Sequence, residues 1–211
     1  MRIGPFVHGE VRNGGFPDWI IQREKEGMAI RCNNKEYLDY VRRFWKKVYE
    51  QVDGCMEKDG GPVIGIQIEN EYGHVGGLQG PEGEAHIRTL TAIAKEIGFD
   101  VPLYTATGWG VACIGDLLPV MGGYCEAPWD QRTCEIEPNA NFVFSHTRND
   151  ALIACDHHVE NANSYNEEDF PFLTAELGGG LQVTMHRRPV AKGCDVGAMS
   201  TVKMGSGAGL L

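Results

Sequence analysis

Apolar and polar residues alternate in blocks along the chain, and the apolar blocks predict five β-strands. Each block is short and ends in polar or turn-forming residues, as expected for strands that run into loops. The predicted strands cover residues 2–10, 62–73, 101–110, 117–127 and 170–180.

Amphipathic stretches between these strands predict helices. In residues 34–53, apolar side chains recur at spacings of three and four, and Gly54 follows where a C-terminal glycine cap belongs. Residues 82–97 show a second apolar stripe of this kind, and further helices are predicted at about 149–163 and from about 196. Strands that alternate with helices are typical of an α/β fold with a parallel sheet. This pattern fits either a doubly wound sheet or part of a (β/α)8 barrel.

Length and charge narrow the classes of protein to consider. The chain has 211 residues, which is typical of one domain or a piece of a larger one. Its net charge of −10 argues against a nucleic-acid partner, which needs a basic surface. No apolar run approaches the roughly 20 residues that cross a bilayer, so we expect no membrane partner.

The cysteines give an indication of compartment but not of a metal site. Seven cysteines are scattered without a CxxC pair, which favours free thiols and a reducing, cytoplasmic location. Secretion stays open if the natural N-terminus lies upstream. The one local metal candidate, "CDHHVEN" at 155–161, fits a polar helix face better than a zinc site. We expect neither a metal nor another cofactor.

Carboxylates collect where the predicted strands end. Glu10, Glu71, Glu126 and Glu176 each follow or close an apolar run. In both candidate architectures, the carboxyl ends of the strands form the edge where functional sites are built. Four acidic strand ends out of five are difficult to explain by solvation alone.

The segment "GGPVIGIQIENEYG", residues 60–73, holds the densest group of such residues. Strand alternation predicts Gln67, Glu69 and Glu71 on one face and Asn70 on the other. Each glutamate could be structural, paired with a buried arginine or lysine, or could take part in chemistry. Spacing alone leaves open which glutamate does which.

Three segments carry a resemblance to a known family. "GGPVIGIQIENEYG" closely resembles the signature of glycoside hydrolase family 35, the β-galactosidases. "RIGPFVHGEVRNGGFPDWI" is similar to the family's preceding strand and loop, and "FPFLTAELGGG" is similar to its nucleophile strand. The three segments follow one another in the family's order over residues 2–180.

The resemblance implies a retaining exo-glycosidase, most simply a β-galactosidase, on a (β/α)8 TIM barrel. By position, Glu71 would be the general acid/base and Glu176 the nucleophile, with carboxyl groups about 5–5.5 Å apart. Asn70 would bond the sugar 2-hydroxyl, and Glu10 would bind hydroxyls of the terminal β-linked sugar of a small carbohydrate substrate. Glu69 receives no chemical role and is interpreted as a structural carboxylate.

Two departures from the family pattern leave the sugar open. Val11 follows Glu10 where many members carry tryptophan, and "LGGGLQVTMHRRP" replaces an aromatic-rich stretch after Glu176. A related exo-β-glycosidase of other specificity and a non-catalytic carbohydrate-binding relative therefore remain alternatives. Trp109, Tyr124 and Trp129 could stack on a sugar or serve only in packing.

The family pattern also predicts how much of a barrel is present. The chain begins inside what resembles the third strand and ends where the eighth would begin. We expect residues 1–211 to be one partial catalytic domain with about strands 3 to 7 of the barrel. A barrel takes eight βα units and typically about 250 residues.

Overall fold

The computed structural model describes residues 1–8, 11–107, 111–124, 165, 169–171 and 173–178. The chain divides into two compact units, one containing Met1–Pro119 and the other beginning at Val120. Each unit is described by itself. For residues 121–124 and 174–178 the backbone alone is described.

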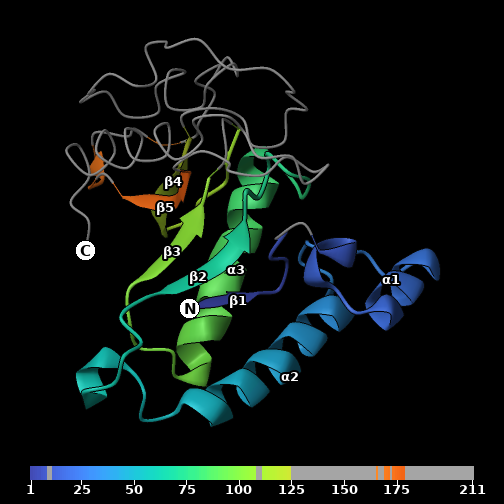
Figure 1. Cartoon of the computed structure of the whole chain (residues 1–211). Coiled ribbons are helices and arrows are strands. Elements are labelled where there is room, and N and C mark those ends of the chain that lie inside the picture. The colour runs from blue at the N-terminus through green and yellow to red at the C-terminus, as the bar shows by residue number, and fades with distance from the viewer. Residues whose placement is uncertain (9–10, 108–110, 125–164, 166–168, 172, 179–211) are drawn as a thin grey trace, which may run out of the picture. The chain divides into compact units, whose positions relative to one another are not determined.

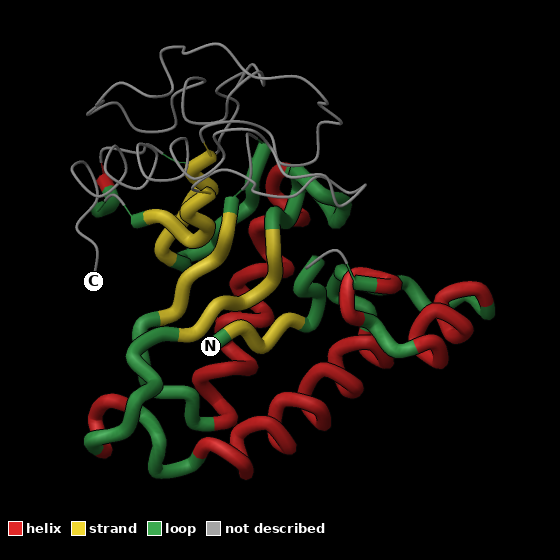
Figure 2. The backbone as a smooth tube through the Cα atoms, viewed as in Figure 1, coloured by secondary structure: helices red, strands yellow, loops and turns green. Residues whose placement is uncertain are grey.

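The first unit is built on three parallel strands: β1 (Arg2–Gly4), β2 (Ile66–Asn70) and β3 (Leu103–Ala106). β2 lies between the other two and pairs with both (Figure 1). Parallel neighbours need a crossover connection, and a helix lies in each one (Figure 2). The predicted alternation of strands and helices is therefore confirmed for this unit.

Helix α2 (Lys35–Val52) is the helix predicted at 34–53. It begins at Asn34, whose side chain accepts a hydrogen bond from the Tyr37 backbone N–H at 3.1 Å, an N-terminal cap. Its apolar stripe buries Val41 and Trp45. The Trp45 indole Nε1 donates to the Ile3 carbonyl at 2.8 Å, which attaches the helix to β1.

Helix α3 (Gly80–Ile97) is the helix predicted at 82–97. Ile87, Leu90 and Ala94 are fully buried along its apolar face. The helix ends at Gly98, which adopts φ 118°, a left-handed conformation that glycine accepts without strain. α3 packs against both β2 and α2 and so covers one face of the small sheet (Figure 1).

Two local predictions differ from the structure. Helix α1 (Asp18–Lys25) follows a short 3-10 turn at Arg12–Gly15, where only a loop is predicted. This helix is eight residues long and buries only Ile20, so its periodic signal is weak. β1 ends at Gly4 rather than at residue 10, because Pro5 has no N–H group to continue the strand ladder.

β4 (Leu118–Tyr124) and β5 (Thr174–Gly178) form a second parallel pair, in which Gly122 lies opposite Glu176. Both strands are predicted by the sequence. The helices predicted at 149–163 and from about 196 lie outside the described residues.

Candidate active site

β2 is buried along its whole length although its second half is polar. Gln67, Glu69 and Asn70 are each at most 2% exposed. Polar groups removed from water are destabilising unless they are hydrogen-bonded, and a buried charge also needs an opposite charge. The partners of these three side chains therefore decide what the strand can do.

The end of β2 is bulged, and this changes the direction of its side chains. The register of β2 against β3 shifts between Gln67 and Asn70, and Glu69 adopts a left-handed backbone with φ 57°. The predicted alternation is wrong here: Gln67 Nε2 donates to Asn70 Oδ1 at 3.0 Å, so these two side chains meet. The left-handed residue interrupts the two-residue repeat that the prediction assumed.

Glu69 forms a buried ion pair with Arg31. Arg31 Nη2 lies 2.8 Å from Glu69 Oε2, and the glutamate side chain is wholly inaccessible to solvent. Burial raises the pKa of Glu69, and the Arg31 guanidinium opposes that shift. The structure thus shows the pairing with a buried arginine that the structural interpretation of this glutamate predicts.

Glu71 is the first residue beyond β2 and is held through its backbone. Its N–H donates to the Ala106 carbonyl of β3 at 2.8 Å, and its own carbonyl accepts from the Val75 N–H at 2.7 Å. Its backbone is left-handed, with φ 48°. The residue is half-buried, whereas Glu69 is fully buried.

Asn70 is fixed in orientation by two donors. Its Oδ1 accepts from Gln67 Nε2 and also from Arg2 Nη2 on β1. Because both contacts use the oxygen, they determine which way the amide group faces. The Nδ2 group is then the side of the amide that neither of these two contacts uses.

The other predicted site residues are described less fully. Glu10 lies outside the described residues, as do Glu126, Trp109 and Trp129. Glu176 is the third residue of β5 rather than its end, and its side chain is not among those described. Tyr124 is the last residue of β4, and the histidine-rich segment 155–161 lies outside the described residues.

Comparison with known proteins places the chain in a family. The sequence model described as "Glycosyl hydrolases family 35" matches residues 1–168. The chain belongs to this family.

Similar curated proteins are named as beta-galactosidases. Beta-galactosidase 17 of Arabidopsis thaliana is 37% identical over 109 residues, which cover 51% of this chain and 15% of the relative. Beta-galactosidase 8 of Oryza sativa subsp. japonica is 32% identical over 112 residues, covering 53% and 16%. Beta-galactosidase 1 of Dictyostelium discoideum is 32% identical over 99 residues, covering 46% and 14%. The matched regions thus span less than a fifth of each relative's length.

Family 35 membership implies a TIM-barrel catalytic domain, and parallel strands that alternate with helices agree with that architecture. β2 ends in the ENE motif of the family signature, at the carboxyl edge where barrel enzymes build their sites. Within the described residues, no helix combines the length and apolarity that crossing a bilayer requires.

The burial of two residues near the ENE motif, Arg31 and His86, was not predicted from the sequence. Arg31 follows an apolar stretch, and nothing in its local pattern shows that it pairs with Glu69. His86 is fully buried on α3, where its spacing of four from Leu90 could have placed it on the apolar face. Burial, with a smaller effect of Arg31, lowers the pKa of His86 to about 4, so the ring is neutral. His86 Nδ1 bonds Asn33 Oδ1 at 2.9 Å, and its ring lies 5.3 Å from that of Tyr72.

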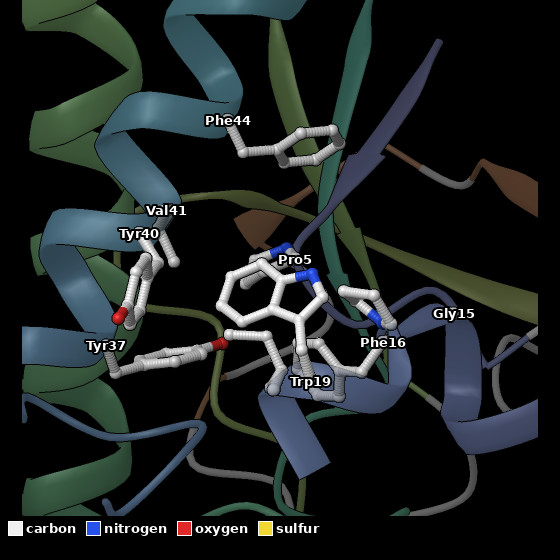
Figure 3. Close-up of a pocket in the computed structure, with 10 residues that line it drawn as sticks. Pro5, Gly15, Phe16, Trp19, Tyr37, Tyr40, Val41 and Phe44 are labelled. Carbon is white, nitrogen blue, oxygen red and sulfur yellow. The ribbon is translucent and has the colours of Figure 1, made fainter. Parts of the chain in front are cut away.

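A cavity of about 180 Å³ between α1 and α2 lacks the groups that a glycosidase needs. Aromatic rings form most of its wall (Figure 3), contributed by Phe16, Trp19, Tyr37, Tyr40 and Phe44. Among the described residues that line it, none carries a charge. Glycoside hydrolysis uses a pair of carboxyl groups, so the candidate active site is at the end of β2 and not in this cavity.

Proposed function

We propose that this chain is part of the catalytic domain of a retaining exo-β-galactosidase. The observation that carries the proposal is the different environment of the two glutamates in the ENE motif. Glu69 is enclosed in an ion pair with Arg31, whereas Glu71 is half-buried at the carboxyl edge of the sheet. Membership of family 35 and the names of the relatives support the reaction class.

In the proposed double displacement, the carboxyl group of Glu71 gives its proton to the glycosidic oxygen while Glu176 attacks the anomeric carbon. The leaving group departs as an alcohol, and the sugar is held as an ester on Glu176. Glu71, now a carboxylate, takes a proton from water as that water attacks the same carbon and releases Glu176. The mechanism requires the two carboxyl groups to lie about 5–5.5 Å apart.

Asn70 and Glu10 are proposed to bind the sugar. Gln67 and Arg2 both donate to Asn70 Oδ1 and so orient the amide group. In this orientation we propose that Nδ2 donates a hydrogen bond to the sugar 2-hydroxyl. Such a bond strengthens as charge develops at the anomeric carbon. Glu10 would accept hydrogen bonds from hydroxyls of the terminal sugar.

The positions of the five strands within the barrel are also a proposal. We assign β1 to β5 as strands 3 to 7 of the family barrel and residues 1–211 as one partial catalytic domain. The substrate is a small carbohydrate with a terminal β-linked sugar, and the proposed chemistry uses no metal or other cofactor.

One observation favours a second candidate, an exo-β-glycosidase that cleaves a different sugar. Val11, at 54% exposure, follows Glu10 where many members carry tryptophan. Replacing a large ring by valine beside the proposed sugar-binding glutamate changes the surface available for stacking, and with it the preference between sugars.

The test measures hydrolysis of nitrophenyl β-D-galactoside, β-D-glucoside and α-D-galactoside. Proton NMR identifies which anomer of the sugar is released first. With the enzyme of which this chain is proposed to be part, we expect hydrolysis of the β-galactoside, no hydrolysis of the α-anomer, and release of the β-anomer of galactose first. Release of the α-anomer would identify an inverting enzyme. Binding of galactose without hydrolysis of any substrate would identify a carbohydrate-binding relative.

A further inference from the structure

We propose that Arg31 is a positioning residue for the acid/base Glu71. The proposal rests on the proposed role of Glu71 and adds how its carboxyl group is held in place. Arg31 is buried and reaches the segment that carries Glu71 at several points, both before and after that residue.

The guanidinium group of Arg31 contacts the backbone on both sides of Glu71. Nη1 donates to the Val75 carbonyl at 2.6 Å, and Nη2 lies 3.4 Å from the Asn70 carbonyl. The Val75 N–H in turn donates to the Glu71 carbonyl at 2.7 Å. The Val75–Glu71 hydrogen bond therefore closes the turn from Asn70 to Val75, and the Arg31 side chain contacts the backbone at both ends of this turn.

The same guanidinium fixes the bulge that directs the strand end. Its Nη2 and Nε approach the two carboxylate oxygens of Glu69 at 2.8 and 3.4 Å. Glu69 is the left-handed residue that breaks the alternation of β2. A non-glycine residue in this conformation persists only where its surroundings hold it, and Arg31 supplies the contact to its side chain.

Two aromatic rings hold Arg31 itself in place. The guanidinium carbon lies 3.8 Å from the centre of the Phe6 ring and 5.2 Å from that of Tyr72. The Tyr72 hydroxyl donates to the Arg31 carbonyl at 2.6 Å. Tyr72 directly follows Glu71, so Arg31 and the turn constrain each other.

This set of contacts requires a planar group with several fixed donors. A lysine ammonium is a single point charge on a flexible stem and cannot reach the carboxylate and both carbonyls together. An Arg31→Lys substitution therefore keeps the positive charge beside Glu69 but releases the turn. This substitution therefore distinguishes the effect of the positive charge of Arg31 from the effect of its fixed hydrogen-bond donors.

Displacement of Glu71 should affect proton donation more than substrate binding. An activated aryl galactoside needs little protonation of its leaving group, whereas an alkyl galactoside needs full protonation. A misplacement of about 1 Å can lower the rate on the order of 100-fold. We therefore expect the rate of glycoside cleavage to fall more for substrates with a poorer leaving group.

The experiment compares Arg31→Lys with Arg23→Lys, an arginine that also bonds a glutamate, Glu36, at 2.6 Å but is 43% exposed. The value of kcat/KM, which reports the first step alone and not the later attack of water, is measured on dinitrophenyl and methyl β-D-galactosides. Arg31→Lys should lose on the order of 100-fold on the methyl glycoside and less than about 10-fold on the dinitrophenyl glycoside, while Arg23→Lys retains both activities. An equal loss on both substrates, or no loss, overturns the positioning role.

A second measurement does not depend on activity. The N–H groups of His74 and Val75 both donate to the Glu71 carbonyl, at 3.0 and 2.7 Å, so their hydrogen exchange reports on the turn. Arg31→Lys should accelerate exchange at these two amides and leave exchange within α2 unchanged. Unchanged exchange at both amides overturns the proposal. If the enzyme of which this chain is proposed to be part hydrolysed no glycoside, the proposed function would be refuted, and the exchange result would still decide whether Arg31 holds the turn.

Discussion

Arg31 and Glu69 form a buried ion pair, with Nη2 and Oε2 2.8 Å apart, although the two residues are 38 positions apart in the chain. Tyr72 and Phe6 flank the arginine, and Glu71 follows two residues after the glutamate. The pair neutralises one carboxylate of the ENE motif inside the protein. It leaves Glu71 as the more accessible carboxyl group.

The first prediction concerns the stability of this pair. Glu69→Gln leaves the Arg31 charge buried without its counterion, which should lower the free energy of unfolding by about 3–5 kcal/mol. Urea denaturation monitored by circular dichroism measures the change. Glu36→Gln is the matched control, because that glutamate pairs with Arg23 on the surface and its loss should shift the midpoint only slightly. Equal midpoint shifts in the two variants would contradict the prediction.

The second prediction separates the two proposed catalytic glutamates. Glu176→Gln should abolish hydrolysis of every substrate, since no covalent intermediate can form. Glu71→Gln should retain the first step on a dinitrophenyl glycoside, whose leaving group departs without protonation. Burst-phase kinetics on activated and unactivated galactosides measure the difference. If both variants were equally inactive on both substrates, the assignment of roles would be wrong.

The third prediction is a pH dependence of stability caused by His86. Its pKa falls from an ordinary value of 6.5 to about 4 in the folded protein, chiefly because it is buried. Above pH 6.5 the ring is neutral in both the folded and the unfolded chain, and the full stability is present. As the pH falls from 6.5 to 4, only the unfolded chain takes up the proton, so stability should decrease by roughly 3 kcal/mol.

Denaturation of wild type and His86→Phe at pH 7, 5.5 and 4.5 checks this dependence. Phenylalanine keeps an aromatic ring in contact with Tyr72 but cannot bind a proton. The difference in stability between the two proteins should therefore change with pH in the stated direction. A constant difference across this range would show that the pKa of His86 is the same in the folded and unfolded states.

The fourth prediction compares two neighbouring aromatic residues of α2. Trp45 is fully buried and bonds the Ile3 carbonyl, whereas Phe44 is 53% exposed at the rim of the apolar cavity. Trp45→Ala should lower the free energy of unfolding by about 3–5 kcal/mol, because it empties a core position. Phe44→Ala should change it by only about 0.5 kcal/mol. Thermal unfolding of both variants measures the contrast, and similar losses would mean that the burial of one of them is misassigned.

Elements with strong local periodicity could be predicted from the amino-acid sequence alone. α2 and α3 are found within one or two residues of the predicted ranges, because their apolar stripes are local signals. β2 to β5 are likewise found inside the predicted apolar runs. The resemblance carried by three segments, of which 60–73 is one, predicted the family, and the match over residues 1–168 confirms it.

The arrangement at the end of β2 could not be predicted from the sequence, because it depends on contacts between distant segments. A period-two pattern cannot show that Glu69 is left-handed, or that its carboxylate pairs with Arg31, which lies 38 positions away in the chain. It likewise cannot show that Gln67 bonds Asn70, or that Glu69 is fully buried while Glu71 is half-buried. The sequence named the residues of the candidate site, but which of them are paired with one another depends on contacts between segments that only folding brings together.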